Sequence, residues 1–286
     1  MSIIDLHIHT SASDGTDSPE ELLQKIRDSD IKTFAVTDHD TITSAVKMSE
    51  KICGEDVKFI RGIEFSCRTR ITDTKCHILG LNYDYDDANL IHALRRGEEI
   101  RHKKFWKRIE ILHDEFNITF TDEEIESLMK IKSVGKPHIA NLIVSKGLAD
   151  NKQEAIDRYV NKCRTGNDRL DSEFVINAIL SSGGIPVWAH PLGGEGEKEL
   201  PEYRFRDTLS ELISYGLHGL ECFYSKYAYS VCEYLESIAN QRGLYVSGGS
   251  DYHGRNKNIP LGKLNAENII VPCERLTITR IIEGVK

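Results

Sequence analysis

The amino-acid sequence predicts an α/β protein in which one helical segment interrupts a regular succession of strands and helices. Three observations support this fold class. Short apolar strands alternate with helices over the first 84 residues, helical periodicity fills residues 85–168, and the alternation of strands and helices then returns. Such alternation is typical of a largely parallel sheet covered by helices, either open or closed into a barrel. We therefore predict one α/β domain from residues 1–84 and 169–286, with a helical insertion at residues 85–168.

The individual elements follow from apolar runs and from capping signals. Ser18 and Glu21 can form a capping box around a helix that is expected to begin at Pro19, and Thr121 with Glu124 is another capping-box signal. Strands are expected at residues 3–8, 32–37, 57–63, 76–81, 185–189, 217–223, 244–247 and 268–271. Further helices are expected at residues 42–52, 88–116, 122–130, 137–146, 152–162, 174–181 and 226–240.

Length and composition restrict the class of protein. The 286 residues suffice for one large domain with an insertion, and no window approaches the roughly 20 apolar residues of a membrane span. The net charge of -8 argues against binding of duplex DNA by the whole surface. Seven cysteines without a CxxC pair, together with an N-terminus that lacks a basic and apolar leader, predict a cytoplasmic protein.

Residues that can bind a metal recur at the ends of the predicted strands. His7 and His9 lie two residues apart at the end of the first strand, where both side chains point to the same side and can reach one metal ion. A single histidine at such a place is usually a hydrogen-bonded structural residue. Burial of six histidines and three carboxylates at one edge would be costly without a compensating ion. The full candidate set is His7, His9, Asp14, His39, Glu64, His77, His190, Asp251 and His253.

These stretches resemble the PHP (polymerase and histidinol phosphatase) family of metal-dependent phosphoesterases. The resemblance rests on Asp5-Leu6-His7-Ile8-His9-Thr10, Ser13-Asp14-Gly15, Ala35-Val36-Thr37-Asp38-His39-Asp40, Gly62-Ile63-Glu64, His77, Ala189-His190-Pro191 and Gly248-Gly249-Ser250-Asp251-Tyr252-His253. It extends almost to the end of the chain. The order, the spacing and the insertion are most similar to the branch that acts on small phosphorylated nucleotides and short RNA.

The resemblance implies a distorted (β/α)7 barrel with three divalent metal ions. The three implied ligand sets are His7, His9, Glu64 and Asp251; Glu64, His77 and His190; and Asp14, His39 and His253. Nitrogen and oxygen ligands suit Mn, Fe or Zn and do not choose among them. Asp38 and Asp40 flank His39, and we expect them to support the ligands from behind or to cap a helix.

The predicted chemistry is the hydrolysis of a phosphoric ester. A water that bridges two metal ions would lose its proton near neutral pH and act as the nucleophile. The candidate catalytic residues are His39, His253 and Asp251, and either histidine could assist the leaving group, although a ligating imidazole is a poor acid. The sequence contains neither GxSxG nor a P-loop, which argues against a serine nucleophile and against nucleoside triphosphate binding of the P-loop type.

Two basic segments of the insertion are candidates for substrate binding. Residues 95–108 hold seven Lys or Arg against two Glu, and Arg101, Lys104 and Arg108 would share one helix face. That face is either solvated or a phosphate site. Lys136 and His138 lie at a predicted helix N-terminus, which favours anions, in a stretch similar to the Gly-Arg-x-His element of the branch. We predict Arg101, Lys104, Lys136 and His138 as substrate-binding residues.

The segment after His190-Pro191 departs from the pattern of that branch. Many members place an Arg there, whereas this chain has glycines and acids at residues 193–197, which argues against a 3',5'-nucleoside bisphosphate as the substrate. The glycines predict a flexible loop that acts as a gate.

We predict a hydrolase for small phosphorylated nucleotides, namely a nucleoside bisphosphate, a monophosphate or a cyclic phosphate. A 5'-to-3' exonuclease for short RNA and a non-catalytic metal-binding module remain the alternatives. No obligate protein partner is predicted.

Overall fold

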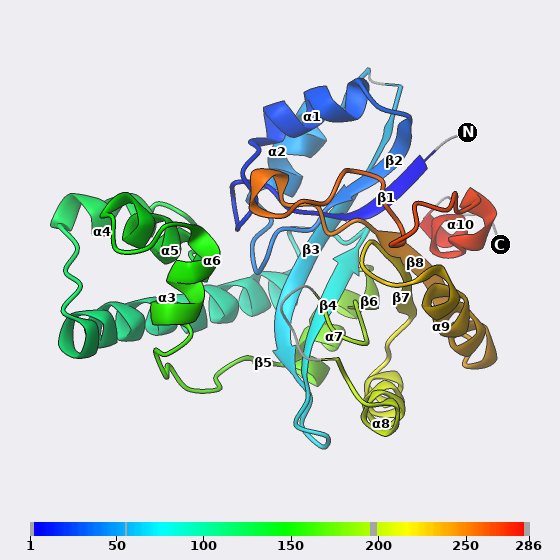
Figure 1. Cartoon of the computed structure of the whole chain (residues 1–286). Helices are drawn as coiled ribbons and strands as arrows, with labels where there is room; N and C mark the ends of the chain where they lie inside the picture. Colours follow the sequence, from blue (N-terminus) through cyan, green and yellow to red (C-terminus); the bar gives the residue numbers. More distant parts are fainter. Residues whose placement is uncertain (1–2, 55, 195–198, 283–286) are drawn as a thin grey trace.

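The computed structural model describes residues 3–54, 56–194 and 199–282 and contains a nearly closed barrel of seven strands (Figure 1). The strands follow one another around the barrel as β1 (Ile3–Ile8), β2 (Ile31–Val36), β3 (Lys58–Arg68), β4 (Lys75–Leu81), β6 (Ile185–Ala189), β7 (Gly219–Tyr224) and β8 (Tyr245–Gly249). Backbone hydrogen bonds between the end of β1 and the residues that follow β8 join the two edges, since His9 N donates to Tyr252 O over 2.8 Å and Asp251 N donates to His7 O over 2.8 Å. The predicted fold class is confirmed.

One strand of the barrel runs antiparallel to its neighbours. The sheet is largely parallel, as expected, but β4 is antiparallel to both β3 and β6. A short turn rather than a helix connects β3 to β4, and such a hairpin reverses the chain. The reversal places His77, near the start of β4, at the same edge of the barrel as residues that follow the other strands.

Helices cover the outside of the barrel. They are α1 (Pro19–Arg27), α2 (Thr43–Lys51), α7 (Ser172–Ser181), α8 (Glu202–Ser214), α9 (Tyr229–Gln241) and α10 (Ile278–Ile282). The capping box of α1 is confirmed, because Glu21 N donates to Ser18 Oγ and Ser18 N donates to Glu21 Oε2. Helix α8 was not predicted, although its buried Phe205, Leu209 and Leu212 have helical spacing.

The strand predicted at residues 268–271 is wrong. These residues form no strand in the structure, and Ile270 is 66% exposed. The side chain of Asn265 hydrogen-bonds both backbone groups of Ile269. Asn265 Oδ1 accepts from Ile269 N over 2.9 Å, and Asn265 Nδ2 donates to Ile269 O over 2.7 Å. The β-forming composition of this segment therefore meets no partner strand. The two-residue strand β5 (Leu170–Asp171), which pairs with β3, was also missed.

The inserted helices lie between β4 and β5. They are α3 (Ala88–Phe116), α4 (Asp122–Met129), α5 (Lys136–Ser145) and α6 (Lys152–Ala155), followed by a π-helical turn at Ile156–Val160. Figure 1 shows α3 extending away from the barrel, with α4, α5 and α6 gathered along its far part. They share a hydrophobic core that includes Phe105, Leu112, Ile139 and Ile143.

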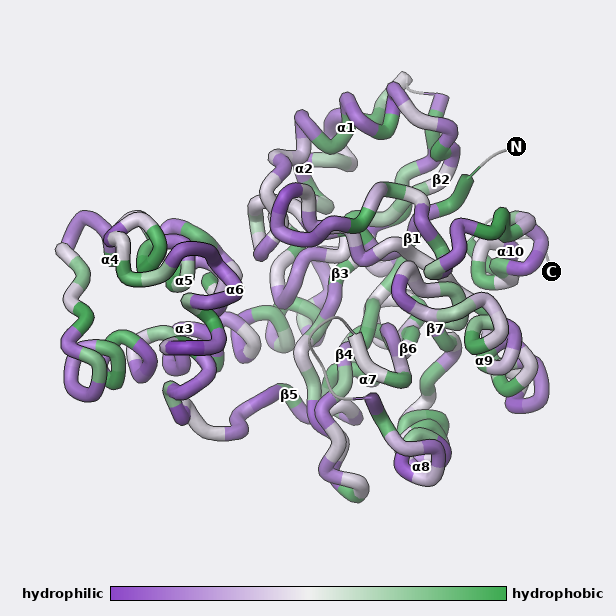
Figure 2. The backbone as a smooth tube through the Cα atoms, in the orientation of Figure 1, coloured by the Kyte–Doolittle hydropathy of each residue, from purple (hydrophilic) through white to green (hydrophobic). Residues whose placement is uncertain are grey.

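The first turns of α3 pack on the barrel. Leu90 and Ala93 belong to the barrel core, whereas Phe105 belongs to the core of the insertion. Hydrophobic and hydrophilic residues alternate along α3 in Figure 2, as expected of a helix with one buried face. The domain boundaries near residues 85 and 168 stay a prediction. Among the described residues, no helix combines the length and apolar composition needed to cross a membrane.

Candidate metal centre

All nine predicted ligands converge at one edge of the barrel. Their side-chain atoms form four overlapping groups, and the atoms within each group lie within 4.8 Å of one another. The groups are His9, Asp14, His39 and His253; His7, Glu64 and His190; His7, His9 and Asp251; and His39, Glu64 and His77. Overlapping clusters of nitrogen and oxygen donors are what a multinuclear metal site requires.

The donor atoms approach one another without forming satisfactory hydrogen bonds. Glu64 Oε2 lies 2.9 Å from His39 Nδ1 and 3.1 Å from His9 Nε2, and His253 Nε2 lies 3.1 Å from Asp14 Oδ1. Yet four of these buried atoms have no hydrogen-bond partner, namely Asp14 Oδ1, His39 Nδ1, Glu64 Oε2 and His253 Nε2. An unsatisfied buried polar group costs about 1–3 kcal/mol. Bound cations would satisfy these atoms, so the residues fit a metal centre.

The carboxylates of the cluster are in the ionised form that a metal requires. Burial alone would raise the pKa of Glu64, but the charges of His39 and His77 hold it well below its usual range. Burial likewise opposes ionisation of Asp14, and His253 and His39 hold its pKa well below the usual range. Burial lowers the pKa of His253, which favours the neutral imidazole that ligates metals.

Neither Asp38 nor Asp40 caps a helix, since Ile42 precedes α2, and both accept hydrogen bonds from neighbouring residues instead. Asp38 Oδ1 accepts hydrogen bonds from Thr10 N over 2.8 Å and from Ser13 Oγ over 2.5 Å, which fixes the loop that carries Asp14. Asp40 is buried, has a φ of 50°, and accepts from Ser66 N over 3.0 Å. Of the two roles expected for these residues, the helix cap is wrong, and support of the candidate ligands stays a prediction.

Two further residues at the centre were missed. Glu221, on β7, contacts His7 Nδ1 at 2.9 Å, and its signal was a lone acidic residue within an apolar strand. Lys257 Nζ lies 2.7 Å from Asp251 Oδ2. Lys257 follows the last barrel strand in a polar loop, where no pattern distinguishes it from a solvent-exposed lysine.

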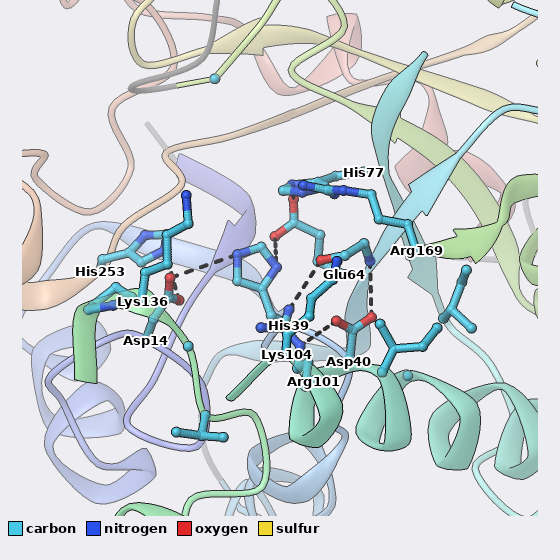
Figure 3. Close-up of a pocket in the computed structure, with 18 of the residues that line it drawn as sticks. Asp14, His39, Asp40, Glu64, His77, Arg101, Lys104, Lys136, Arg169 and His253 are labelled. Carbon is cyan, nitrogen blue, oxygen red and sulfur yellow. Dashed lines mark hydrogen bonds and ion pairs between the residues drawn. The ribbon is translucent and has the colours of Figure 1, made fainter. Parts of the chain in front are cut away.

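A cavity of about 350 Å³ lies between the cluster of candidate ligands and the insertion. Its lining includes Asp14, His39, Glu64, His77, His190, Asp251 and His253 of the cluster. Cationic side chains line the same cavity, namely Arg101, Lys104, Arg108, Lys136, Arg169 and Lys257. Figure 3 shows several of these cations together with His39 and Glu64. The arrangement suits an anionic ligand held against a metal centre.

Comparison with known proteins agrees with this geometry. Residues 5–167 match the family model of the PHP domain, which is more than half of the chain. The chain belongs to the PHP family. The resemblance noted in the sequence is thereby confirmed.

Two curated relatives match this PHP chain over most of its length. The phosphoribosyl 1,2-cyclic phosphate 1,2-diphosphodiesterase of Eggerthella lenta is 26% identical over 90% of this chain and 97% of its own length. The 5'-3' exoribonuclease Rnm of Escherichia coli is 29% identical over 91% of this chain and 88% of its own length. A solved structure described as a metal-dependent phosphoesterase of Bifidobacterium adolescentis has a TM-score of 0.81 and 25% identity, covering 98% of this chain and 96% of its own. The chain is a metal-dependent phosphoesterase of the PHP type.

Three of the four residues predicted to bind substrate line the cavity of this PHP protein. Arg101 Nη2 donates to Ser66 Oγ over 3.1 Å, Lys104 Nζ donates to Asp168 O, and Lys136 Nζ donates to Asn161 Oδ1 over 2.7 Å. His138 is not among the described residues that line the cavity. Its Nδ1 accepts from Gly135 N over 3.0 Å, which caps α5.

The cations of the cavity repel one another. Burial and the nearby charges of Arg169 and Arg108 lower the pKa of Lys104 to about 8. Burial, followed by the charge of Arg108, also lowers the pKa of Lys136. In addition, Arg108 Nε and Arg169 Nη1 are buried and have no hydrogen-bond partner. Arg108 shares the helix face expected for Arg101 and Lys104, whereas Arg169 was missed because it stands alone before β5.

The predicted gate after Pro191 falls only partly within the described residues. Gly194 lines the cavity, and Gly193 has a φ of 111°, a backbone conformation that glycine adopts readily. Residues 195–197 of the predicted gate lie outside the described residues.

Proposed function

We propose that this PHP protein hydrolyses a phosphate ester of a small nucleotide, namely a nucleoside bisphosphate, a monophosphate or a cyclic phosphate. The observation that carries the proposal is the joint lining of one cavity of about 350 Å³ by candidate metal ligands and by cations. A volume of this size lies within the range of small-molecule sites. The cations would bind the phosphoryl oxygens and thereby hold the ester against the metal centre.

The proposed centre holds three divalent ions, Mn, Fe or Zn. The ligand sets are His7, His9, Glu64 and Asp251; Glu64, His77 and His190; and Asp14, His39 and His253. Glu64 occurs in two of the structural groups, as expected of a bridging carboxylate. Such ions supply Lewis-acid stabilisation of phosphoryl oxygens and a water of lowered pKa when bound.

The side chains that line the cavity would bind the phosphate and assist catalysis. Lys104, Arg108, Lys136 and Arg169 face the same space and would orient the phosphate through charge-assisted hydrogen bonds. The charge of Asp251 raises the pKa of Lys257 despite burial of that lysine, so its ammonium remains protonated and suits an anion. His39, His253 and Asp251 line the cavity and remain the candidate catalytic residues.

A 5'-to-3' exonuclease for short RNA is the second candidate, favoured by the identity with Rnm. RNA binding over several phosphates requires free cations along the strand. Three exposed cations of α3 are instead paired with acids over 2.6–2.8 Å, namely Arg96 with Glu99, Lys103 with Asp168 and Lys107 with Glu110. This pairing supports the small substrate. The presence of all nine candidate ligands argues against a non-catalytic module.

Product analysis by chromatography, together with phosphate release, tests the proposal on the Mn-reconstituted protein, because opening of a cyclic phosphate or cleavage of RNA frees no inorganic phosphate. The panel contains a 3',5'-nucleoside bisphosphate, a 2',3'-cyclic nucleotide, a 5'-monophosphate, a ribose 1,2-cyclic phosphate and a short 5'-phosphorylated RNA. We expect the highest kcat/KM for one of the mononucleotides. Activity that rises with RNA length and falls steeply with salt would establish the exonuclease instead. If the metal-loaded protein is inactive on every substrate, both the nucleotide phosphoesterase and the exonuclease are contradicted for these classes of ester.

A further inference from the structure

Glu221 connects two candidate metal ligands that come from different strands. Its side chain is fully buried in β7, a strand whose other residues are apolar or aromatic apart from glycine. Oε1 lies 2.9 Å from His7 Nδ1, and Oε2 accepts a hydrogen bond from His190 N over 2.7 Å. Burial of a carboxylate is costly unless its partners satisfy it. Here both oxygens are used, and both partners carry candidate ligand imidazoles.

The contact with Glu221 fixes which nitrogen of His7 is available to a metal. A carboxylate beside Nδ1 favours the tautomer in which Nδ1 carries the proton. In a metal-loaded centre the other nitrogen, Nε2, is then the ligating atom, and it lies 3.2 Å from His9 Nε2 and 3.4 Å from Glu64 Oε2. Glu221 therefore orients His7 and selects its ligating atom.

The second contact holds an unusual backbone. His190 has a φ of 30°, in a region that residues other than glycine rarely adopt. Glu221 Oε2 anchors its N–H, and the imidazole then lies with Nε2 3.1 Å from Glu64 Oε1. Without that anchor, the backbone would be free to relax and carry the ring away from Glu64.

We propose that Glu221 is a positioning residue that sets the metal affinity of the centre by orienting His7 and His190 together. The inference rests on the proposed metal centre. A carboxylate is required because both partners donate, whereas an amide offers one acceptor oxygen and places an NH₂ against the second donor. Glu221→Gln therefore keeps the volume and loses one of the two contacts.

Glu211 provides a matched control. It is also a buried glutamate, and it also accepts backbone hydrogen bonds with both oxygens, from Ile71 N over 2.6 Å and from Thr72 N over 2.8 Å. It lies on α8 and belongs to none of the groups of metal-ligating residues. Glu211→Gln thus reproduces the loss of a buried carboxylate without disturbing the centre.

The test measures Mn binding and histidine tautomers in the folded proteins. Mn affinity is determined by competition with a chelator, bound metal by elemental analysis, and the protonated nitrogen of His7 by ¹⁵N NMR of the Zn-loaded protein. We expect Glu221→Gln to bind Mn about 10- to 100-fold more weakly and to change the His7 imidazole signals. Glu211→Gln should match the wild type in both measurements.

The outcomes separate this inference from the metal centre itself. A wild-type protein that binds no Mn would overturn the proposed centre, and with it the role of Glu221. A wild-type protein that binds Mn together with Glu221→Gln of equal affinity would overturn the role of Glu221 alone. Equal loss of affinity in both variants would reduce Glu221 to a structural role. If Glu221→Gln does not fold, Glu221→Asp replaces it, because the shorter side chain does not span both donors. Glu221→Asp should also bind Mn more weakly than the wild type, and equal affinity would overturn the role of Glu221.

Discussion

Arg101 Nε lies 2.5 Å from Asp40 Oδ2, so a cation of the insertion is paired with a buried carboxylate of the barrel. Asp40 follows His39 directly in the sequence. Helix α3 approaches Asp40 closely, since a Cβ added at Gly97 would lie 3.2 Å from Asp40 Cβ. The pair therefore joins α3 closely to the loop that carries a candidate ligand. Arg101 was predicted only as a substrate contact, but its geometry gives it a part in assembling the site.

Arg101→Ala should destabilise the protein as well as weaken substrate binding. Removal of one partner of a buried ion pair leaves an uncompensated charge and costs about 3–5 kcal/mol. Asp40 is 3% exposed in its side chain, whereas Arg101 is 18% exposed, so the lower end of that range is expected. Urea unfolding measures the change.

Asp40→Asn provides the comparison for that loss. The double variant should lose less than the sum of the two single changes, because the second change removes a charge that the first has left unpaired. Additive losses, or wild-type stability of Arg101→Ala with only a raised KM, would contradict the assembling role.

Asp14→Asn should abolish hydrolysis while leaving the fold largely intact. Asp14 belongs to the group with His9, His39 and His253, and one of its oxygens is buried without a hydrogen-bond partner. Loss of that ligand should lower the bound metal by about one ion per chain on the trinuclear assignment, as elemental analysis measures. Asp114→Asn is the control, since Asp114 is exposed and pairs with His113. Full residual activity of Asp14→Asn would remove Asp14 from the centre.

The convergence of the candidate ligands was predictable from the sequence because they are local signals at strand ends. His7 and His9 needed only the period of a strand, and the structure brings their Nε2 atoms to 3.2 Å. The position of His77 depended on the direction of β4, which a hairpin and not its composition determines. The element pattern also predicted inserted helices, but not how the first turns of α3 would pack.

Residues that act through distant partners could not be found in the same way. Glu221 contacts His7, which lies 214 residues earlier in the sequence, and no local sequence pattern predicts such a contact. Arg169 and Lys257 reach the cavity only because the chain returns from the insertion and from β8 beside it. By contrast, residues 268–271 have β-forming composition but receive no partner strand, so propensity alone misled the prediction.

Lys136→Ala and Arg169→Ala should each raise KM for a phosphorylated substrate with a smaller effect on kcat. Hydrogen bonds to charged groups contribute about 1.5–3 kcal/mol, which corresponds to roughly 10- to 100-fold in KM. Lys103→Ala is the matched control, because Lys103 is 75% exposed, pairs with Asp168 and does not line the cavity. Unchanged KM in the cavity variants, or an equal rise in Lys103→Ala, would remove this cationic cluster from substrate binding.

The affinity for a phosphorylated substrate should fall as the pH rises through about 8, the value to which burial and its cationic neighbours lower the pKa of Lys104. Arg101 and Arg108 on the same helix and Arg169 from the returning chain oppose its charge, while Asp168 favours it. Below this pH Lys104 is an ammonium that binds phosphate, and above it the amine is neutral, so the interaction is lost. A bound dianion would move this transition to higher pH.

The pH dependence of product inhibition by inorganic phosphate measures this loss. Lys104→Arg keeps its charge throughout the range and should therefore bind phosphate with an affinity that changes little between pH 7 and pH 9. Lys104→Met should bind weakly at every pH in that range. Neither variant retains an amine that ionises between pH 7 and pH 9. If both variants lose affinity for phosphate with the same pH dependence as the wild type, a group other than Lys104 controls that pH dependence.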